Sequence, residues 1–147
     1  MTATPGTNVL KILLDSDALI AMIEESDTSH VRAVKIFGAL TQQNAHLFIT
    51  SSVVAEVITT LQRKYGHRSA AGDLYERFMT NWVEIVPVGS DLLTSAHAYF
   101  TDSGSKQNTI FDAINIAAVK AHNFDAIFSF DRWYHRQGIR LVEDMLP

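Results

Sequence analysis

Five acidic residues stand where a strand is expected to end or a helix to begin. They are Asp15, Asp17, Glu56, Asp112 and Asp131. Asp15 directly follows an apolar run, Asp17 lies two residues further on, and Asp131 closes another apolar run near the end of the chain. In parallel α/β sheets, functional groups gather at the carboxyl ends of the strands. We therefore expect these carboxylates to lie at one edge of a sheet.

Carboxylates that converge in this way repel one another and raise each other's pKa. A hard divalent cation removes that penalty, because Mg²⁺ and Mn²⁺ prefer oxygen ligands. A Mg²⁺ ion held by such a cluster orients and activates water and neutralises charge on a phosphate. The acids taken together therefore lead to the hypothesis of a metal site that hydrolyses a phosphate ester.

Each acid also has a purely structural interpretation. Asp is a preferred helix N-cap, and Asp17 fits the cap of a helix predicted over 18–25. Thr109-x-x-Asp112 resembles a capping box, although that box prefers Glu or Gln. Glu56 lies on a polar helical stripe that faces either solvent or a cleft. An acid such as Asp112, in an otherwise apolar and Ala-rich segment, is costly unless something compensates its charge.

Strand-like and helix-like patterns alternate along the chain. Short apolar runs predict five strands, over 9–14, 46–50, 82–88, 126–130 and 139–142. Amphipathic or Ala-rich segments predict helices over 18–25, 28–43, 51–64, 69–81, 90–101 and 109–122. Strands separated by helices imply right-handed crossovers and a sheet covered on both faces. We expect an α/β fold, a three-layer α/β/α sandwich with a central, mainly parallel sheet of about five strands.

Composition bounds the class of protein. The 147 residues suit one domain, and we expect a loose tail over 1–8 followed by a single domain over 9–147. Apolar residues make up 47% of the chain, which excludes a disordered protein, and the lack of cysteine excludes disulfides. No apolar run approaches the roughly 20 residues of a membrane span, and no signal peptide begins the chain. We therefore expect a cytoplasmic protein that does not bind a membrane.

The net charge of −4 argues against a nucleic-acid binder that relies on overall charge alone. Without the five acids, however, the remaining Asp and Glu no longer outnumber the 12 Lys and Arg residues. Two clusters of basic residues are candidates for contacting RNA phosphates. The alternative is that they are solvated cations at helix ends, where the helix dipole favours positive charge. The first cluster comprises Arg63, Lys64, His67 and Arg68, and the second Arg132, His135, Arg136 and Arg140.

The acids and their neighbours resemble the four acidic motifs of PIN domains. Asp15 follows an apolar strand, Glu56 closes Ser-Ser-x-x-x-Glu, and Asp112 lies in Phe-Asp-Ala-Ile-x-x-Ala-Ala. The fourth motif is Ser129-Phe-Asp131 before Arg-Trp-Tyr. The order and spacing match from about residue 10 to 142. The size of the chain is similar to that of the single-domain VapC-like toxins of prokaryotic toxin–antitoxin pairs.

This resemblance implies a metal-dependent endoribonuclease. In the family, the acids that match Asp15, Glu56, Asp112 and Asp131 build the Mg²⁺ or Mn²⁺ site. Water then attacks an RNA phosphodiester and leaves a 5′-phosphate and a 3′-hydroxyl. Ser129 matches a position that supports the last acid. Asp17 stands where family members often carry Asn or Ser, and is either a further ligand or a helix cap.

The resemblance also implies partners. Family toxins commonly form homodimers, and a small VapB-like antitoxin inserts a segment over the active cleft. For the RNA substrate, the candidate contacts are Ser129, Arg132 and Arg136, which lie around the last acid. Trp133 and Tyr134 either stack on an unpaired base or pack a short helix onto the core.

Two other functions stay open from the sequence. Asp15-Ser16-Asp17 resembles the Asp-x-Asp start of haloacid-dehalogenase-type phosphatases, in which the first Asp is the nucleophile. Leu19 stands where that family expects Thr or Val. The third candidate is a non-catalytic RNA-binding PIN relative, which usually lacks one of the metal acids, whereas all four are present here.

Overall fold

A computed structural model describes residues 6, 8–100 and 108–147 of the chain. Four parallel strands form one sheet in the order β3-β2-β1-β4. The strands are β1 (Lys11–Leu14), β2 (His46–Thr50), β3 (Glu84–Val86) and β4 (Ala126–Phe128). Most of the predicted tail over 1–8 lies outside the described residues, so the tail and the domain boundary at residue 9 stay predictions.

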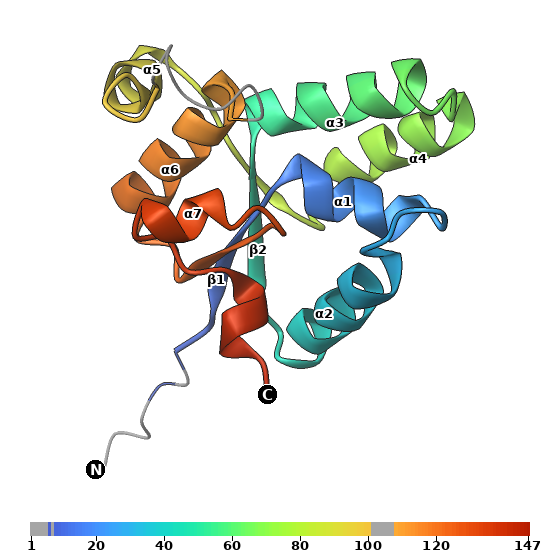
Figure 1. Ribbon diagram of the computed structural model, residues 1–147, viewed down its shortest axis with the longest axis horizontal. Coiled ribbons are helices and arrows are strands. Elements are labelled where there is room, and N and C mark those ends of the chain that lie inside the picture. Colours follow the sequence, from blue (N-terminus) through green and yellow to red (C-terminus); the bar gives the residue numbers. More distant parts are fainter. Residues whose placement is uncertain (1–5, 7, 101–107) are drawn as a thin grey trace.

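Helices connect the strands and cover both faces of the sheet (Figure 1). They are α1 (Ser16–Ile23), α2 (His30–Gln42), α3 (Ser51–Arg63), α4 (Arg68–Phe78), α5 (Ser90–Ala96), α6 (Ile110–His122) and α7 (Trp133–Arg136). A 3₁₀ helix, η1 (Val142–Met145), follows. The two faces have separate apolar cores, one with α1 to α4 and the other with α5 to α7. The predicted three-layer α/β/α sandwich is confirmed.

Alternating side chains of each strand feed the two cores. Ile12 and Leu14 of β1 pack on the α1–α4 side, whereas Leu13 between them packs on the α5–α7 side. All three side chains are fully buried. A strand buried on both faces has a continuous run of apolar residues, which is why the sequence predicted this strand.

The predicted fifth strand over 139–142 does not form. Leu141 makes one isolated parallel bridge with Ile127, and the chain then turns into the 3₁₀ helix. The apolar pattern that suggested a strand is explained by burial, because Ile139, Leu141 and Val142 are all buried. A short apolar run shows that a segment is buried, but not that it pairs over several residues.

The strand order places a topological switch point between β1 and β4. From β1 the chain moves outward through β2 to β3, then returns to the other side of β1 as β4. In such sheets ligands bind outside the carboxyl ends of the strands at the switch point. None of the helices in the described part of the chain is long and apolar enough to cross a membrane.

The first prediction concerns the packing of α3, the helix that carries Glu56. Val57 on α3 is fully buried, whereas Val31 on α2 is 78% exposed. Val57→Ala should lower the free energy of unfolding by about 2–3 kcal/mol, because it removes buried methyl groups and leaves a cavity. Val31→Ala, the matched control, should change it by less than about 0.5 kcal/mol. Urea unfolding measures both, and equal losses would contradict this description of the core.

Candidate metal centre at the carboxyl end of the sheet

Asp15 is the first residue after β1 and the most deeply placed acid of the site, only 4% exposed. The backbone N–H of Asp15 donates to the Phe128 carbonyl (3.1 Å), which continues the pairing of β1 with β4 by one residue. Its Oδ1 accepts from the Ser16 N–H (2.8 Å) and caps α1. The N-cap of this helix is therefore Asp15, and the helix begins at residue 16, two residues before its predicted start. Asp17, for which a ligand and a helix cap were both open, is not the N-cap, although its Oδ1 accepts from the Ala18 N–H (2.7 Å) in the first turn.

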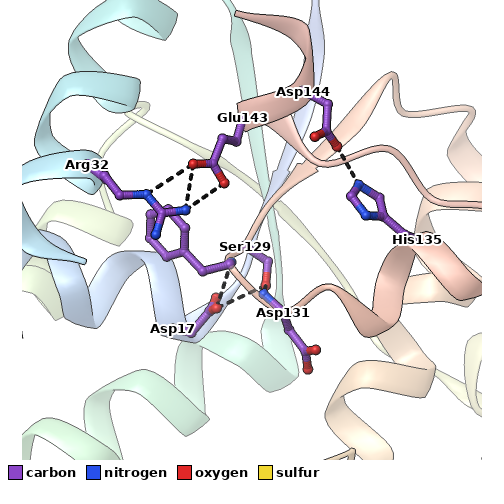
Figure 2. A network of polar contacts seen from close by, with 8 residues as sticks. Asp17, Arg32, Ser129, Asp131, His135, Glu143 and Asp144 are labelled. Carbon is purple, nitrogen blue, oxygen red and sulfur yellow. Dashed lines mark hydrogen bonds and ion pairs between the residues drawn. The ribbon is translucent and has the colours of Figure 1, made fainter. Parts of the chain in front are cut away.

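Asp17 lies in the first turn of α1 and holds the end of β4 (Figure 2). Its Oδ2 accepts hydrogen bonds from the Ser129 hydroxyl (3.0 Å) and the Phe130 N–H (2.8 Å). The Ser129 hydroxyl in turn accepts from the Asp131 N–H (3.1 Å). Two segments more than a hundred residues apart are thereby joined, and Asp131 is held through Ser129.

Asp131 and Asp112 are each held by further hydrogen bonds. The Asp131 carboxylate accepts from the Trp133 N–H (2.9 Å) and from Nδ2 of Asn108 (3.1 Å). Asp112 completes a capping box with Thr109 at the start of α6, accepting from its N–H at 2.8 Å. Its other oxygen, Oδ1, lies 3.1 Å from the Tyr134 hydroxyl. The structural and functional interpretations of Asp112 are therefore compatible, since each uses a different oxygen.

Glu56 approaches the acids from α3. The Thr50 side chain caps this helix by accepting from the Val53 N–H (3.2 Å). Glu56 is half-buried on the face opposite the apolar stripe, and Thr60, one turn later, lies on the same face. Of the two interpretations of the polar stripe, the cleft is the one that the structure supports.

One cleft of about 250 Å³ receives all five acids. Its lining residues are Asp15, Ser16, Asp17, Glu56, Thr60, Thr109, Asp112 and Asp131. Among the described residues that line it, every charged side chain is acidic. The elements that contribute these acids are α1 and the ends of β1 and β4, together with α3 and α6. This arrangement is the one expected for groups collected at a switch point.

Burial and mutual repulsion raise the pKa of four of these carboxyl groups. The pKa of Asp15 lies well above its usual value, first because of burial and then because of the charges of Asp17, Asp112 and Glu56. Burial also raises the pKa of Asp17 to about 6, despite the hydrogen bonds from Phe130 and Ser129. The pKa values of Glu56 and Asp112 are raised by burial and by neighbouring acids.

The chemistry of the donor set fits a hard divalent cation. Several carboxylates with raised pKa values gain from a positive charge placed among them, and Mg²⁺ and Mn²⁺ favour such oxygen ligands. Within the described ranges, no three or more His, Asp or Glu side chains are placed so that together they could hold a metal ion. Mg²⁺ usually binds through one or two carboxylates and keeps several waters, so three protein ligands in place are not required.

The basic residues predicted to contact RNA lie outside this cleft. Arg132 and Arg136 are exposed on and beside α7, directly after Asp131. His135 is paired with Asp144 (Figure 2), and His67 is paired with the buried Glu24 at 2.8 Å. Tyr134 is fully buried, so it does not stack on a base and instead packs α7 onto the core.

Sequence reasoning missed two polar residues of the site. Asn115 on α6 is fully buried, and its Nδ2 donates to Oδ1 of Asp15 (3.1 Å). The Tyr134 hydroxyl lies 2.9 Å from Oδ2 of Asp15. A signal for Asn115 was present, because an amide between Ile114 and Ile116 in an apolar helix needs a buried partner. Tyr134 carried no such signal, since its ring alone explains its burial.

Comparison with known proteins decides the family. The model of the PIN domain family matches residues 12–138, which span the strands, the cleft and α7. This chain belongs to the PIN domain family. Among curated proteins, no sequence matches this PIN domain.

Three solved structures share the fold of this PIN domain. VapC20 from Mycobacterium tuberculosis, described as a toxin that cleaves the sarcin–ricin loop, is 20% identical, with a TM-score of 0.76 over 87% of this chain and 95% of its own. A toxin–antitoxin complex from Klebsiella pneumoniae is 17% identical, with a TM-score of 0.57 over 82% and 87%. FitAcB from Neisseria gonorrhoeae is 17% identical, with a TM-score of 0.58 over 82% and 88%. At these identities the likeness establishes the fold.

The second prediction follows from the repulsion in the cleft. In metal-free buffer near neutral pH, Glu56→Gln should raise the melting temperature by a few degrees, about 3 °C for each 1 kcal/mol of relieved desolvation and repulsion. The pKa of Glu56 is raised in the folded state. The wild type therefore loses stability as the pH rises past the ordinary carboxyl pKa, because the unfolded chain releases the proton first.

The stabilising effect of Glu56→Gln should accordingly be small near pH 4 and grow toward pH 7, which thermal scans across that range measure. The matched control is Glu76→Gln on α4, where the side chain is exposed. A variant less stable than the wild type at neutral pH, with Glu76→Gln unchanged, would show that Glu56 is not under repulsion.

Proposed function

We propose that this PIN domain is a Mg²⁺- or Mn²⁺-dependent endoribonuclease that hydrolyses the phosphodiester bonds of RNA. The observation that carries the proposal is the single cleft lined by Asp15, Asp17, Glu56, Asp112 and Asp131. A bound Mg²⁺ ion would neutralise phosphate charge and activate water. Without such a cation, an RNA phosphate approaching this acidic cleft would meet only repulsion from its lining charges.

The proposed roles of the residues follow from their surroundings. Asp15, Asp112, Asp131 and Glu56 hold the metal, directly or through water. Asp17 is assigned to fixing the end of β4, since its Oδ2 already accepts two hydrogen bonds from that segment. Burial raises the pKa of Glu56, and a carboxylate that faces the cleft can also orient water by accepting a hydrogen bond from it.

The phosphatase alternative is less well supported by these contacts. It needs Asp15 as a nucleophile, but Asp15 is nearly inaccessible and both its oxygens accept hydrogen bonds. Membership of the PIN family also favours the nuclease. The presence of all four candidate acids favours an enzyme over a non-catalytic RNA-binding relative.

We further propose that this protein is the toxin of a VapBC-type pair and acts in the cytoplasm, where its RNA substrate is found. The likeness to VapC20 and to a toxin–antitoxin complex supports this role. A small VapB-like antitoxin and a homodimer are the partners that the family resemblance implies. Co-purification of the chain with the product of a neighbouring small open reading frame would test the pairing.

The third prediction tests the proposed activity directly. Asp15→Asn should abolish RNA cleavage in the presence of Mg²⁺ or Mn²⁺ while the fold survives, because Asn removes a ligand charge but keeps the Oδ1 acceptor that caps α1. Millimolar metal should raise the melting temperature of the wild type and not of the variant, since an ion that binds only the folded state stabilises it.

The matched control for this experiment is Asp73→Asn, at an exposed position of α4. A small phosphate ester is incubated in parallel with the RNA. Turnover of the ester without RNA cleavage would establish the phosphatase instead. Wild-type RNase activity in purified Asp15→Asn would refute the assignment of the site.

The fourth prediction concerns Arg132 and Arg136, two exposed cations that follow Asp131 along the chain. Replacing either with Gln should raise KM for RNA and leave kcat nearly unchanged, because a cation on a phosphate contributes to binding in the ground and transition states alike. The slope of the salt dependence of binding should fall by about one for each phosphate that is no longer neutralised. Lys35→Gln on α2, an exposed cation elsewhere, is the control. Unchanged KM and salt slope in both variants would exclude a role for these arginines in RNA binding.

A further inference from the structure

Two buried polar side chains lie beneath the acids and are not used by the proposed reaction. Asn115 comes from α6 and Tyr134 from α7, and both are fully buried. They reach the site from the α5–α7 side of the sheet, whereas α1 and α3 approach from the other. A buried amide and a buried hydroxyl are costly unless their hydrogen bonds are made.

The Tyr134 hydroxyl lies between two carboxylates. Its oxygen is 2.9 Å from Oδ2 of Asp15 and 3.1 Å from Oδ1 of Asp112. Nδ2 of Asn115 is 3.1 Å from the same hydroxyl and 3.1 Å from Oδ1 of Asp15. The Asn115 side-chain oxygen faces the Thr50 hydroxyl at 3.5 Å, so the amide nitrogen points toward Asp15 and the Tyr134 hydroxyl.

The Asn115 amide and the Tyr134 hydroxyl have three polar hydrogens to share among their neighbours. The amide has two N–H groups, and one goes to Asp15 while the other goes to Tyr134. The tyrosine accepts that bond and has a single O–H, which serves one carboxylate at a time. The hydroxyl therefore accepts from Asn115 and lies at nearly equal distances from two carboxylates, to one of which it donates at a time.

We propose that Tyr134 is a positioning residue whose hydroxyl, oriented by Asn115, sets the spacing of Asp15 and Asp112 for a divalent ion. The inference rests on the proposed function, because it gives that metal site its support. Groups that hydrogen-bond to metal ligands fix ligand orientation, and their removal typically weakens metal affinity or activity by about 10- to 100-fold. A role in packing alone would need the ring of Tyr134 but not its hydroxyl.

The test is Tyr134→Phe, which keeps the ring and removes only the hydroxyl. Mn²⁺ affinity is measured without RNA, from the electron paramagnetic resonance signal of free Mn²⁺. We expect the affinity to fall by about tenfold or more. With RNA, kcat should fall while KM changes little. The control is Tyr99→Phe, which removes a hydroxyl from a half-buried ring on the α5–α6 side and outside the cleft.

A second variant covers the case in which Tyr134→Phe does not fold. Asn115→Leu keeps the size of the side chain and removes the donor that orients the hydroxyl, so it should also weaken Mn²⁺ binding. Where both single variants fold, the loss in the double variant should be smaller than the product of the two single losses, because part of the Asn115 effect acts through the Tyr134 hydroxyl.

The outcomes separate this inference from the function on which it rests. If Tyr134→Phe binds Mn²⁺ within twofold of the wild type, the positioning role is wrong and the metal site stands. If the wild type takes up no Mn²⁺, or Asp15→Asn takes it up equally well, the metal site and the positioning role are both refuted.

Discussion

Like charges held close together in a partly buried cleft are the constraint on which the rest of this structure depends. Desolvation and mutual repulsion both act against the folded protein here, as the raised pKa values of Asp15, Asp17, Glu56 and Asp112 show. The fold tolerates this cost because donors are fixed around the acids. Backbone N–H groups of α1, α6 and the end of β4 supply several of them. The repulsion among these acids is thus partly offset by N–H groups at helix starts, which have no partner within the helix.

The same donors explain why capping and catalysis need not be competing interpretations. Asp15 caps α1 and Asp112 closes a capping box on α6, yet both line the cleft. A carboxylate has two oxygens, so one can satisfy the helix while the other faces a neighbour or an ion. Capping also orders the side chain before any ligand arrives, which lowers the entropy cost of binding.

The sequence predicted most of the layers and the acids, because both depend on local pattern. Parallel strands read as apolar runs, and acids after them mark strand ends, as at Leu14–Asp15. The local pattern did not specify which residues far apart in the sequence form contacts. The bridge of Leu141 to Ile127 stops after one residue, and Asp17 bonds Ser129 and Phe130 in addition to the Ala18 N–H of its own helix. Both depend on how β4 lies beside β1, which spacing along the chain does not specify.

Asn115 and Tyr134 show that the α5–α7 face of the sheet also contributes polar groups to the site. Asp15, at the end of β1, lies between the helices α1 and α3 on one face of the sheet and α6 and α7 on the other. Hydrogen bonds from α6 and α7 therefore hold this carboxylate from the second face. The amide and hydroxyl act from within the other core, where water does not compete for their hydrogen bonds. A side chain that looks like core in the sequence therefore takes part in the polar network, because the site lies at the junction of the two cores and not on the surface of either.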